Sequence, residues 1–265
     1  NNLRITAQLI DAKTDAHLWA DKYSGTLDDI FDIQEQVSRS IVDSLKIKLS
    51  PRDTERIMQK PMADGAAYEC YLKANREIWR FTEEGIDRAI AYLIEAEKMI
   101  GENAYLYSAL ADAHLQYINI GVRQRDSLVS VTEYAQKALA IDPDFSKAHA
   151  VLGWIDYWYG NNRQSVSHFQ KALSVNPNEY AALHGLAALL VWHGKADEVA
   201  PYIKRMQQID PLSPFSHSIK AGADFHVGRY REALPLIEKA FGMDPENRVL
   251  EFYYCWILAY NGRRT

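Results

Sequence analysis

The spacing of apolar residues changes near residue 26. Residues 3–9 alternate apolar and polar side chains, and residues 16–23 form a second strand-like stretch after a polar, turn-like segment at 11–15. Alternation of this kind gives each strand one apolar face. The pattern therefore predicts a β-hairpin with a short connection.

A helical pattern follows the hairpin. Apolar side chains recur three or four residues apart, which places them on one face of a helix. They are Ile30, Ile33, Val37, Ile41 and Leu45. The segment 26–29 begins with a hydroxyl side chain and ends with a carboxylate, as in a capping box at a helix start. We expect Ser50-Pro51 to end this helix.

From residue 138 onward the residues that break helices keep a fixed period of 34. The prolines of this series are Pro143, Pro177, Pro211 and Pro245. The glycines are Gly160, Gly194, Gly228 and Gly262. The sequence motif before the prolines also recurs, as Ala138-Leu139-Ala140-Ile141-Asp142 and Ala172-Leu173-Ser174-Val175-Asn176. Two breaker residues with one period and a constant offset indicate a repeated structural unit.

A period of about 34 residues is typical of a helix–turn–helix repeat. The sequence resembles the tetratricopeptide repeat (TPR) family from residue 67 to its end. The resemblance implies a mainly α fold at residues 67–265, a right-handed α-solenoid of about five and a half repeats. Each repeat has a helix A and a helix B, and residues 51–66 are expected to be a linker.

Residues 3–49 resemble the closing part of a TolB-like α/β domain. The resemblance rests on Thr6-Ala7-Gln8-Leu9-Ile10-Asp11, His17-Leu18-Trp19 and the segment 28–34. Such domains often precede TPRs in bacterial proteins, behind a class III adenylate/guanylate cyclase domain or a winged-helix DNA-binding domain. We therefore expect residues 1–50 to be the truncated end of an α/β domain. Its open strand edge would be covered by a second copy of the chain, giving a homodimer, or by the solenoid.

The repeats contain several irregular positions. From Leu110 to Ala138 is 28 residues, whereas the matching interval in the next repeat is 20, and we expect the extra residues to lengthen the turn between the helices. Lys220 and Asp224 replace apolar residues and are spaced to pair on one helix face. Two prolines are expected near the start of a helix B, where a missing N–H costs little. They are Pro201 and Pro235.

Composition limits the classes of partner. The chain has 265 residues, 48% of them hydrophobic, and a net charge of −5, with acidic and basic residues interspersed. A basic stripe for nucleic acid and an apolar run long enough for a membrane helix are both missing. Cys70 and Cys255 are expected to be buried free thiols. Because the chain starts without Met and stops within a motif, we expect a piece of a longer protein. We expect it to be cytoplasmic, or periplasmic if a membrane helix lies upstream.

The sequence contains no motif for catalysis, a metal or a cofactor. It lacks a phosphate loop, His-Glu-x-x-His, Cys-x-x-Cys and Gly-x-Ser-x-Gly. The eight histidines show no i/i+4 pairing, so each is expected to be a packed or solvated helix residue. We therefore predict no enzyme in this segment. Any cyclase chemistry would belong to another domain of the parent protein.

In TPR proteins, helix A lines a concave groove through a few fixed motif positions. Carried over to this sequence, these positions predict an aromatic groove. Its residues are Trp154, Tyr157, Trp158, His184, Trp192, Phe215, Phe225, His226, Phe252, Trp256 and Tyr260. The fifth position lacks the Lys/Asn pattern with which some TPRs hold a C-terminal carboxylate. The alternatives are that these rings pack between neighbouring helices, or that the chain's own N-terminal segment fills the groove.

These features predict a non-catalytic, regulatory TPR region whose groove binds a protein or peptide segment. The resemblance implies a bacterial signalling parent with an adenylate/guanylate cyclase domain. One alternative is a dimerisation module of a winged-helix regulator or a similar parent. A small-molecule substrate in the groove is a further alternative, which the lack of convergent polar residues disfavours.

Overall fold

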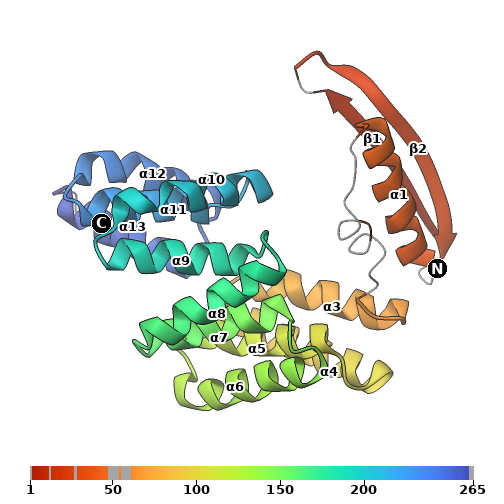
Figure 1. Ribbon diagram of the computed structural model, residues 1–265, viewed down its shortest axis with the longest axis horizontal. Helices are drawn as coiled ribbons and strands as arrows, with labels where there is room; N and C mark the ends of the chain where they lie inside the picture. The colour runs from red at the N-terminus through yellow and green to blue at the C-terminus, as the bar shows by residue number, and fades with distance from the viewer. Residues whose placement is uncertain (1, 12, 27–28, 47–53, 55–60, 263–265) are drawn as a thin grey trace. The chain divides into compact units, whose positions relative to one another are not determined.

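The computed structural model describes residues 2–11, 13–26, 29–46, 54 and 61–262. It shows a mainly helical TPR array preceded by an antiparallel hairpin, as predicted (Figure 1). The chain divides into two units. The first contains Asn1–Leu72 and Glu95–Gly101, and the second contains Lys73–Ile94 and Glu102–Thr265.

The first unit begins with the predicted hairpin. Strand β1 (Asn2–Asp11) pairs antiparallel with β2 (Ala16–Thr26), with Ile5 opposite Tyr23. Helix α1 (Ile30–Ser44) buries Phe31 and Ile33. The Tyr23 hydroxyl, 3.2 Å from Ser40 Oγ, connects β2 to this helix. The alternating and helical patterns of the sequence are therefore both confirmed here.

Asp29 lies at the start of α1. Its carboxylate accepts hydrogen bonds from the Thr26 backbone N–H at 2.7 Å and the Thr26 hydroxyl at 2.9 Å. The backbone bond, followed by the hydroxyl bond, lowers the pKa of Asp29. These bonds match the carboxylate half of the capping box expected from the sequence. Helix α1 begins at Ile30, however, and its N-cap residue Asp29 caps no backbone N–H of the helix. The predicted stop at Ser50-Pro51 lies outside the described residues.

Helix α1 also packs on the first helix of the array. Helix α3 (Gly65–Ile78) begins within the first unit. The rings of Phe31 and Tyr68 lie 4.7 Å apart, and Gln34 Nε2 donates to the Tyr68 hydroxyl at 3.3 Å. The apolar face of α1 is therefore shared between the hairpin and the first turn of α3.

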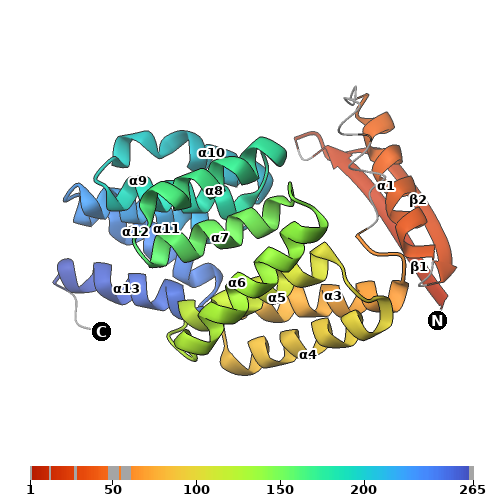
Figure 2. The same cartoon turned by 60° about the horizontal axis from the view of Figure 1, so that its bottom comes forward.

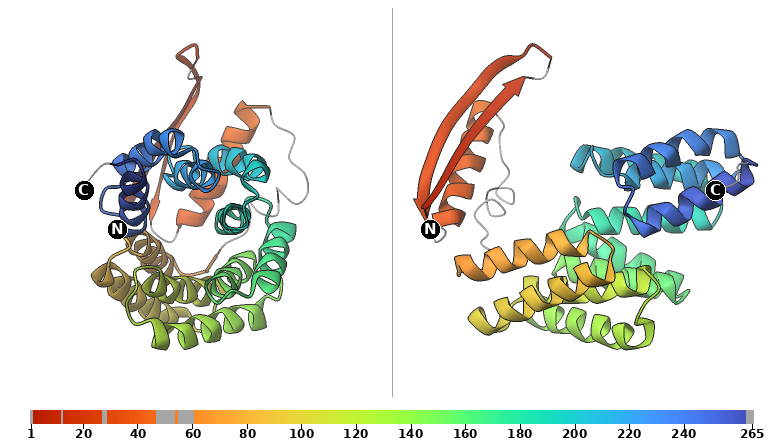
Figure 3. Two further views of the ribbon diagram at one scale, coloured as in Figure 1. Left: turned by 90° about the vertical axis from the view of Figure 1, so that its left-hand side faces the viewer. Right: turned by 180° about the vertical axis from the view of Figure 1, so that it is seen from behind.

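The repeats continue as paired helices laid side by side in sequence order (Figures 1 and 2). Seen end-on, those of the second unit follow a curved path (Figure 3). The helices after α3 are α4 (Glu83–Ile100), α5 (Ala104–Asn119), α6 (Gln124–Ile141), α7 (Ser146–Trp158), α8 (Asn162–Val175), α9 (Tyr180–Trp192), η2 (Ala196–Glu198), α10 (Ala200–Ile209), α11 (Phe215–His226), α12 (Tyr230–Met243) and α13 (Arg248–Tyr260). The end of α4, from Glu95, belongs to the first unit. The first repeat is α3 and α4, the second α5 and α6, the third α7 and α8, the fourth α9 and α10 and the fifth α11 and α12, with the A helix named first in each; α13 is the A helix of the sixth.

The periodic glycines end the A helices as predicted. Their φ angles are 73°, 71°, 81° and 71° at Gly160, Gly194, Gly228 and Gly262. This left-handed conformation costs glycine nothing, because it has no Cβ. In the first repeat the left-handed residue of the turn is not a glycine but Phe81, with φ 52°.

Two expectations about irregular positions were wrong. The extra residues of the second repeat lengthen its helices, to 16 residues in α5 and 18 in α6 against 13 in α7 and 14 in α8. Continued helix keeps the backbone groups hydrogen-bonded, whereas a longer turn would not. Pro201 lies in the first turn of α10 as expected. Pro235 lies inside α12, because that helix already begins at Tyr230.

Neighbouring helices approach closely around Phe169. Its side chain on α8 is fully buried and lies against Gly153 of α7 and Gly185 of α9. A Cβ at Gly185 would lie 2.1 Å from the ring, and one at Gly153 would lie 2.6 Å from it. The two glycines therefore make room for this ring between the A helices of the third and fourth repeats.

Candidate functional site

The predicted groove residues all lie on A helices of the second unit, as the motif positions require. Helix α7 carries three of them, α9 two, α11 three and α13 three. The structure separates them into an inner cluster and a C-terminal aromatic patch, with Trp158 at the edge. We define the inner cluster as Trp154, Tyr157, His184 and Phe215 together with Trp79 and Phe81.

The inner cluster is a continuous chain of rings. Ring centroids are 5.2 Å apart for Trp154 and Tyr157, 5.1 Å for Trp154 and His184, and 5.3 Å for His184 and Phe215. The Trp154 indole N–H donates to the Ala181 carbonyl at 3.1 Å, which ties α7 to α9. These rings therefore pack on one another rather than line an empty channel.

Burial changes the titration of this cluster. Desolvation lowers the pKa of His184 to about 4, because the surrounding rings offer its charged form no partner. Desolvation, followed by the nearby Tyr253 phenol of α13, raises the pKa of Tyr157. At neutral pH the inner cluster is therefore uncharged.

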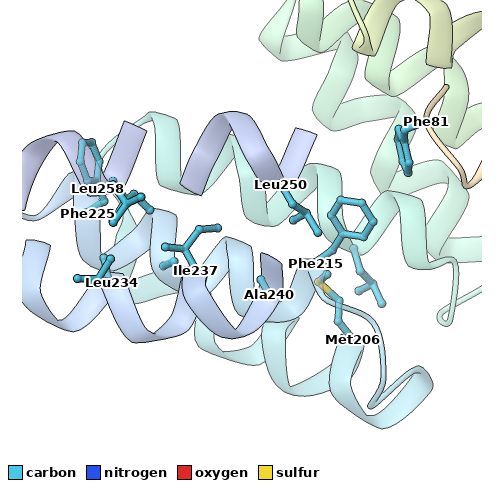
Figure 4. Close-up of a cluster of buried hydrophobic side chains, with 13 residues drawn as sticks. Phe81, Met206, Phe215, Phe225, Leu234, Ile237, Ala240, Leu250 and Leu258 are labelled. Atoms are coloured by element: carbon cyan, nitrogen blue, oxygen red, sulfur yellow. The ribbon is translucent and has the colours of Figure 1, made fainter. Parts of the chain in front are cut away.

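The cluster continues into the first repeat, which the groove prediction did not include. The Phe215 ring lies 6.0 Å from Phe81 and 6.2 Å from Trp79, both in the turn after α3. Figure 4 shows Phe81 beside Phe215, away from the rest of its hydrophobic core cluster. Trp79 occupies the same motif position in the first repeat as Trp158 does in the third, so the sequence could have identified it if the groove positions had also been applied to the first repeat. No periodic signal identifies Phe81.

The C-terminal aromatic patch comprises Trp192 of α9, Phe225 and His226 of α11, and three rings of α13. These three are Phe252, Trp256 and Tyr260. Trp192 stacks on Trp256 at 6.2 Å, and Trp256 lies 4.8 Å from Phe225.

The patch has a buried base and an exposed rim. Phe225 is 7% exposed, whereas Trp192 is 47%, Tyr260 56% and Phe252 65% exposed. Burial lowers the pKa of His226, so this ring is neutral at pH 7. The patch therefore presents uncharged aromatic surface to solvent.

Trp158 lies at the edge of the inner cluster, 5.6 Å from the Tyr157 ring, and also takes part in a polar network. Its indole N–H donates to Asn119 Oδ1 at 2.9 Å, and Asn119 donates to Gln116 at 2.7 Å. Gln116 in turn donates to Asp112 at 2.7 Å. Burial raises the pKa of Asp112 to about 6. This chain of hydrogen bonds joins α5 to α7 and leaves about half of the Trp158 surface exposed.

The structure thus reduces the number of predicted groove residues that a partner could reach. Phe215 and Phe225 are nearly buried, and the inner cluster fills its own space, as the alternative of packed rings allowed. The most exposed of the predicted rings are Trp158, Trp192, Phe252 and Tyr260, and Trp79 of the inner cluster is 49% exposed.

The predicted Lys220–Asp224 pair is confirmed at 3.3 Å. Arg229 adds a second ion pair to Asp224 at 2.7 Å. Asp224 is 6% exposed, so one buried carboxylate holds two cations at the turn after α11.

Within the described residues, no group of three His, Cys, Asp or Glu side chains is placed to hold a metal ion. His149 and His168 do meet, with their Nδ1 atoms 3.3 Å apart. This contact between α7 and α8 is not visible in the sequence, where the two residues are far from i/i+4 spacing. No helix in the described part of the chain combines the length and hydropathy of a bilayer span.

Comparison with known proteins agrees with the geometry. A family model described as tetratricopeptide repeat matches residues 80–265. A Rhizobium meliloti (strain 1021) protein named "Putative adenylate cyclase 3" is 29% identical over 167 residues, which cover 60% of this chain and 27% of the relative. The chain therefore spans about a quarter of the length of this relative.

Two solved structures are also similar to the chain. A thermophilic TPR protein of Thermus thermophilus has a TM-score of 0.55 at 18% identity, over 72% of this chain and 99% of that one. A tetratricopeptide repeat protein of Parabacteroides merdae has a TM-score of 0.44 at 15% identity, over 74% and 75% of the two chains.

Proposed function

The chain belongs to the tetratricopeptide repeat family, and we propose that its array binds a protein segment through the C-terminal aromatic patch. The observation that carries this proposal is the exposure of the rim. Three rings from two different A helices present about half or more of their surface to solvent. Large aromatic side chains in this setting are common anchors of protein interfaces.

The chemistry of the patch specifies the kind of segment. Its rings are neutral, and the neighbouring cations Lys220 and Arg229 are already paired with Asp224. We therefore propose an apolar or aromatic face of an extended or helical segment as the ligand. Binding of this kind changes little with salt, because no ion pair has to be screened.

A pull-down from host lysate with matched surface variants tests the proposal. The Trp192→Ala, Phe252→Ala double variant removes two of the three rim rings, and its fold should survive because about half or more of each side chain is exposed. Val129→Ala, Leu212→Ala is the control, since both residues are exposed apolar side chains outside the patch. We expect the control to retain the wild-type partner and the rim variant to lose it. Equal retention by both variants would refute the patch as the binding surface.

We also propose that this region is the regulatory arm of a bacterial signalling protein that carries an adenylate/guanylate cyclase domain. The similarity to the Rhizobium meliloti protein supports this, since that relative is named as a cyclase and is much longer than the matched segment. In this proposal residues 1–50 are the C-terminal part of a TolB-like domain, and catalysis lies elsewhere in the parent.

A second candidate function is dimerisation through the hairpin. In the described part of the chain the sheet contains only β1 and β2. Each strand therefore has one edge without a strand partner, and such edges favour pairing with another chain. Light scattering over a range of concentrations distinguishes the two functions. A mass that doubles with concentration favours dimerisation, and a constant monomer mass contradicts it.

A further inference from the structure

One turn of the array has a bulky side chain where the others have a left-handed glycine. The turns of the later repeats each contain a left-handed glycine, which Arg123 accompanies at φ 46° in the second repeat. A Cβ at Gly160, Gly194 or Gly228 would meet nothing within 4 Å. The repeat architecture therefore needs no side chain at this place. In the first repeat Phe81 adopts the same conformation, with φ 52°. A bulky residue is strained there and needs surrounding contacts to hold it.

The contacts of the Phe81 ring include a residue of a distant repeat as well as its neighbour Trp79. Its side chain is 4% exposed and belongs to the same hydrophobic core cluster as Phe215, Leu250 and Ile257 (Figure 4). The Phe215 ring lies 6.0 Å from the Phe81 ring. Phe215 is the first residue of α11, the A helix of the fifth repeat. Trp79 packs on both rings, at 5.9 Å from Phe81 and 6.2 Å from Phe215.

This contact joins two repeats that are not neighbours in the sequence. Repeats normally touch their sequence neighbours only, whereas Phe81 and Phe215 join the first repeat to the fifth. The contact completes the chain of rings that runs through His184 to Trp154. We propose that Phe81 and Phe215 form a clasp that holds the first repeat against the fifth, and that the strained backbone of Phe81 lets this clasp open without unfolding of the array.

The clasp has the properties of a two-state element. In the closed state, burial of two rings offsets the strained backbone of Phe81. In the open state, the turn relaxes and both rings become accessible. The opening itself is a property of the chain alone, so the experiment needs no partner.

Native-state amide exchange on the whole chain tests the clasp, with Phe81→Ala as the first variant. It removes the ring and keeps a residue with a Cβ at the strained position. We expect amide exchange at the start of α11 and in the turn after α3 to become about tenfold faster. Without the Phe81 ring, local opening no longer has to break the contact with Phe215, so it costs less free energy. X-ray scattering should show a larger radius of gyration.

Two further variants keep the test decisive. Phe81→Gly removes the ring but relieves the strain, so it should fold even if Phe81→Ala does not, and it should give the same local opening. Phe145→Ala is the matched control, since Phe145 is similarly buried but packs on Tyr105 in the adjacent repeat. Phe145→Ala should leave exchange at the start of α11 unchanged. The clasp is overturned if Phe81→Gly leaves exchange there and the radius of gyration at wild-type values, or if Phe145→Ala changes them equally. Failure of the pull-down would leave this result unaffected.

Discussion

The packing of Phe169 between two glycines gives a prediction in which one chemical change has opposite effects at two positions. Gly185 and Gly222 both lie inside A helices, α9 and α11. A Cβ at Gly185 would lie 2.1 Å from Phe169 Cζ, whereas one at Gly222 would meet Val191 Cγ1 at 3.6 Å. The first distance is a severe overlap, and the second is an ordinary contact.

The magnitudes follow from two opposing effects. Alanine in place of helical glycine stabilises a helix by about 1 kcal/mol. Overpacking a buried side chain costs about 1–3 kcal/mol, and the overlap at Phe169 places Gly185→Ala at the upper end. We therefore expect Gly185→Ala to lower the free energy of unfolding by about 2 kcal/mol. Gly222→Ala should raise it by about 0.5–1 kcal/mol.

Urea unfolding followed by circular dichroism measures both variants. The cause is isolated by adding Phe169→Leu, which vacates the space that the new methyl group needs. We expect the double variant to be at least about 1 kcal/mol more stable than the sum of the single effects predicts. Strict additivity, or the same sign for both glycine substitutions, would refute the packing argument.

Two further predictions concern charged groups. Asp224→Ala leaves Lys220 and Arg229 without their shared carboxylate and should lower the free energy of unfolding in urea by about 2 kcal/mol. Glu198→Ala is the control, because the ion pair of Glu198 with Lys195 is exposed and its loss should change the free energy of unfolding little. Equal losses of stability in the two variants would contradict this prediction. Burial lowers the pKa of His184 from 6.5 to about 4. Stability is therefore full above pH 6.5 and falls as the pH drops from 6.5 toward 4, by at most about 1.4 kcal/mol per pH unit. Unfolding measured against pH should show this slope, and His184→Leu should reduce it. An unchanged slope would be evidence against a buried neutral imidazole.

Much of the fold could be read from the chain because the relevant signals are local. The alternation before residue 26 predicted the hairpin, and the period of 34 residues fixed the helix pairs and the left-handed glycines. The Lys220–Asp224 pair could be predicted because both residues lie on one helix. Helix ends were less certain, as Pro235 shows, because a helix can begin one turn earlier in one repeat than in another.

The sequence alone placed the predicted aromatic rings on A helices of the array, because the repeat period and the motif positions are local features of the chain. Only the tertiary structure decided which of them are accessible. The curvature of a solenoid is the sum of small rotations between successive repeats, and no local pattern encodes that sum. It brings Phe81 onto Phe215 and fills the inner cluster, while Trp192 and Phe252 remain exposed on the C-terminal aromatic patch.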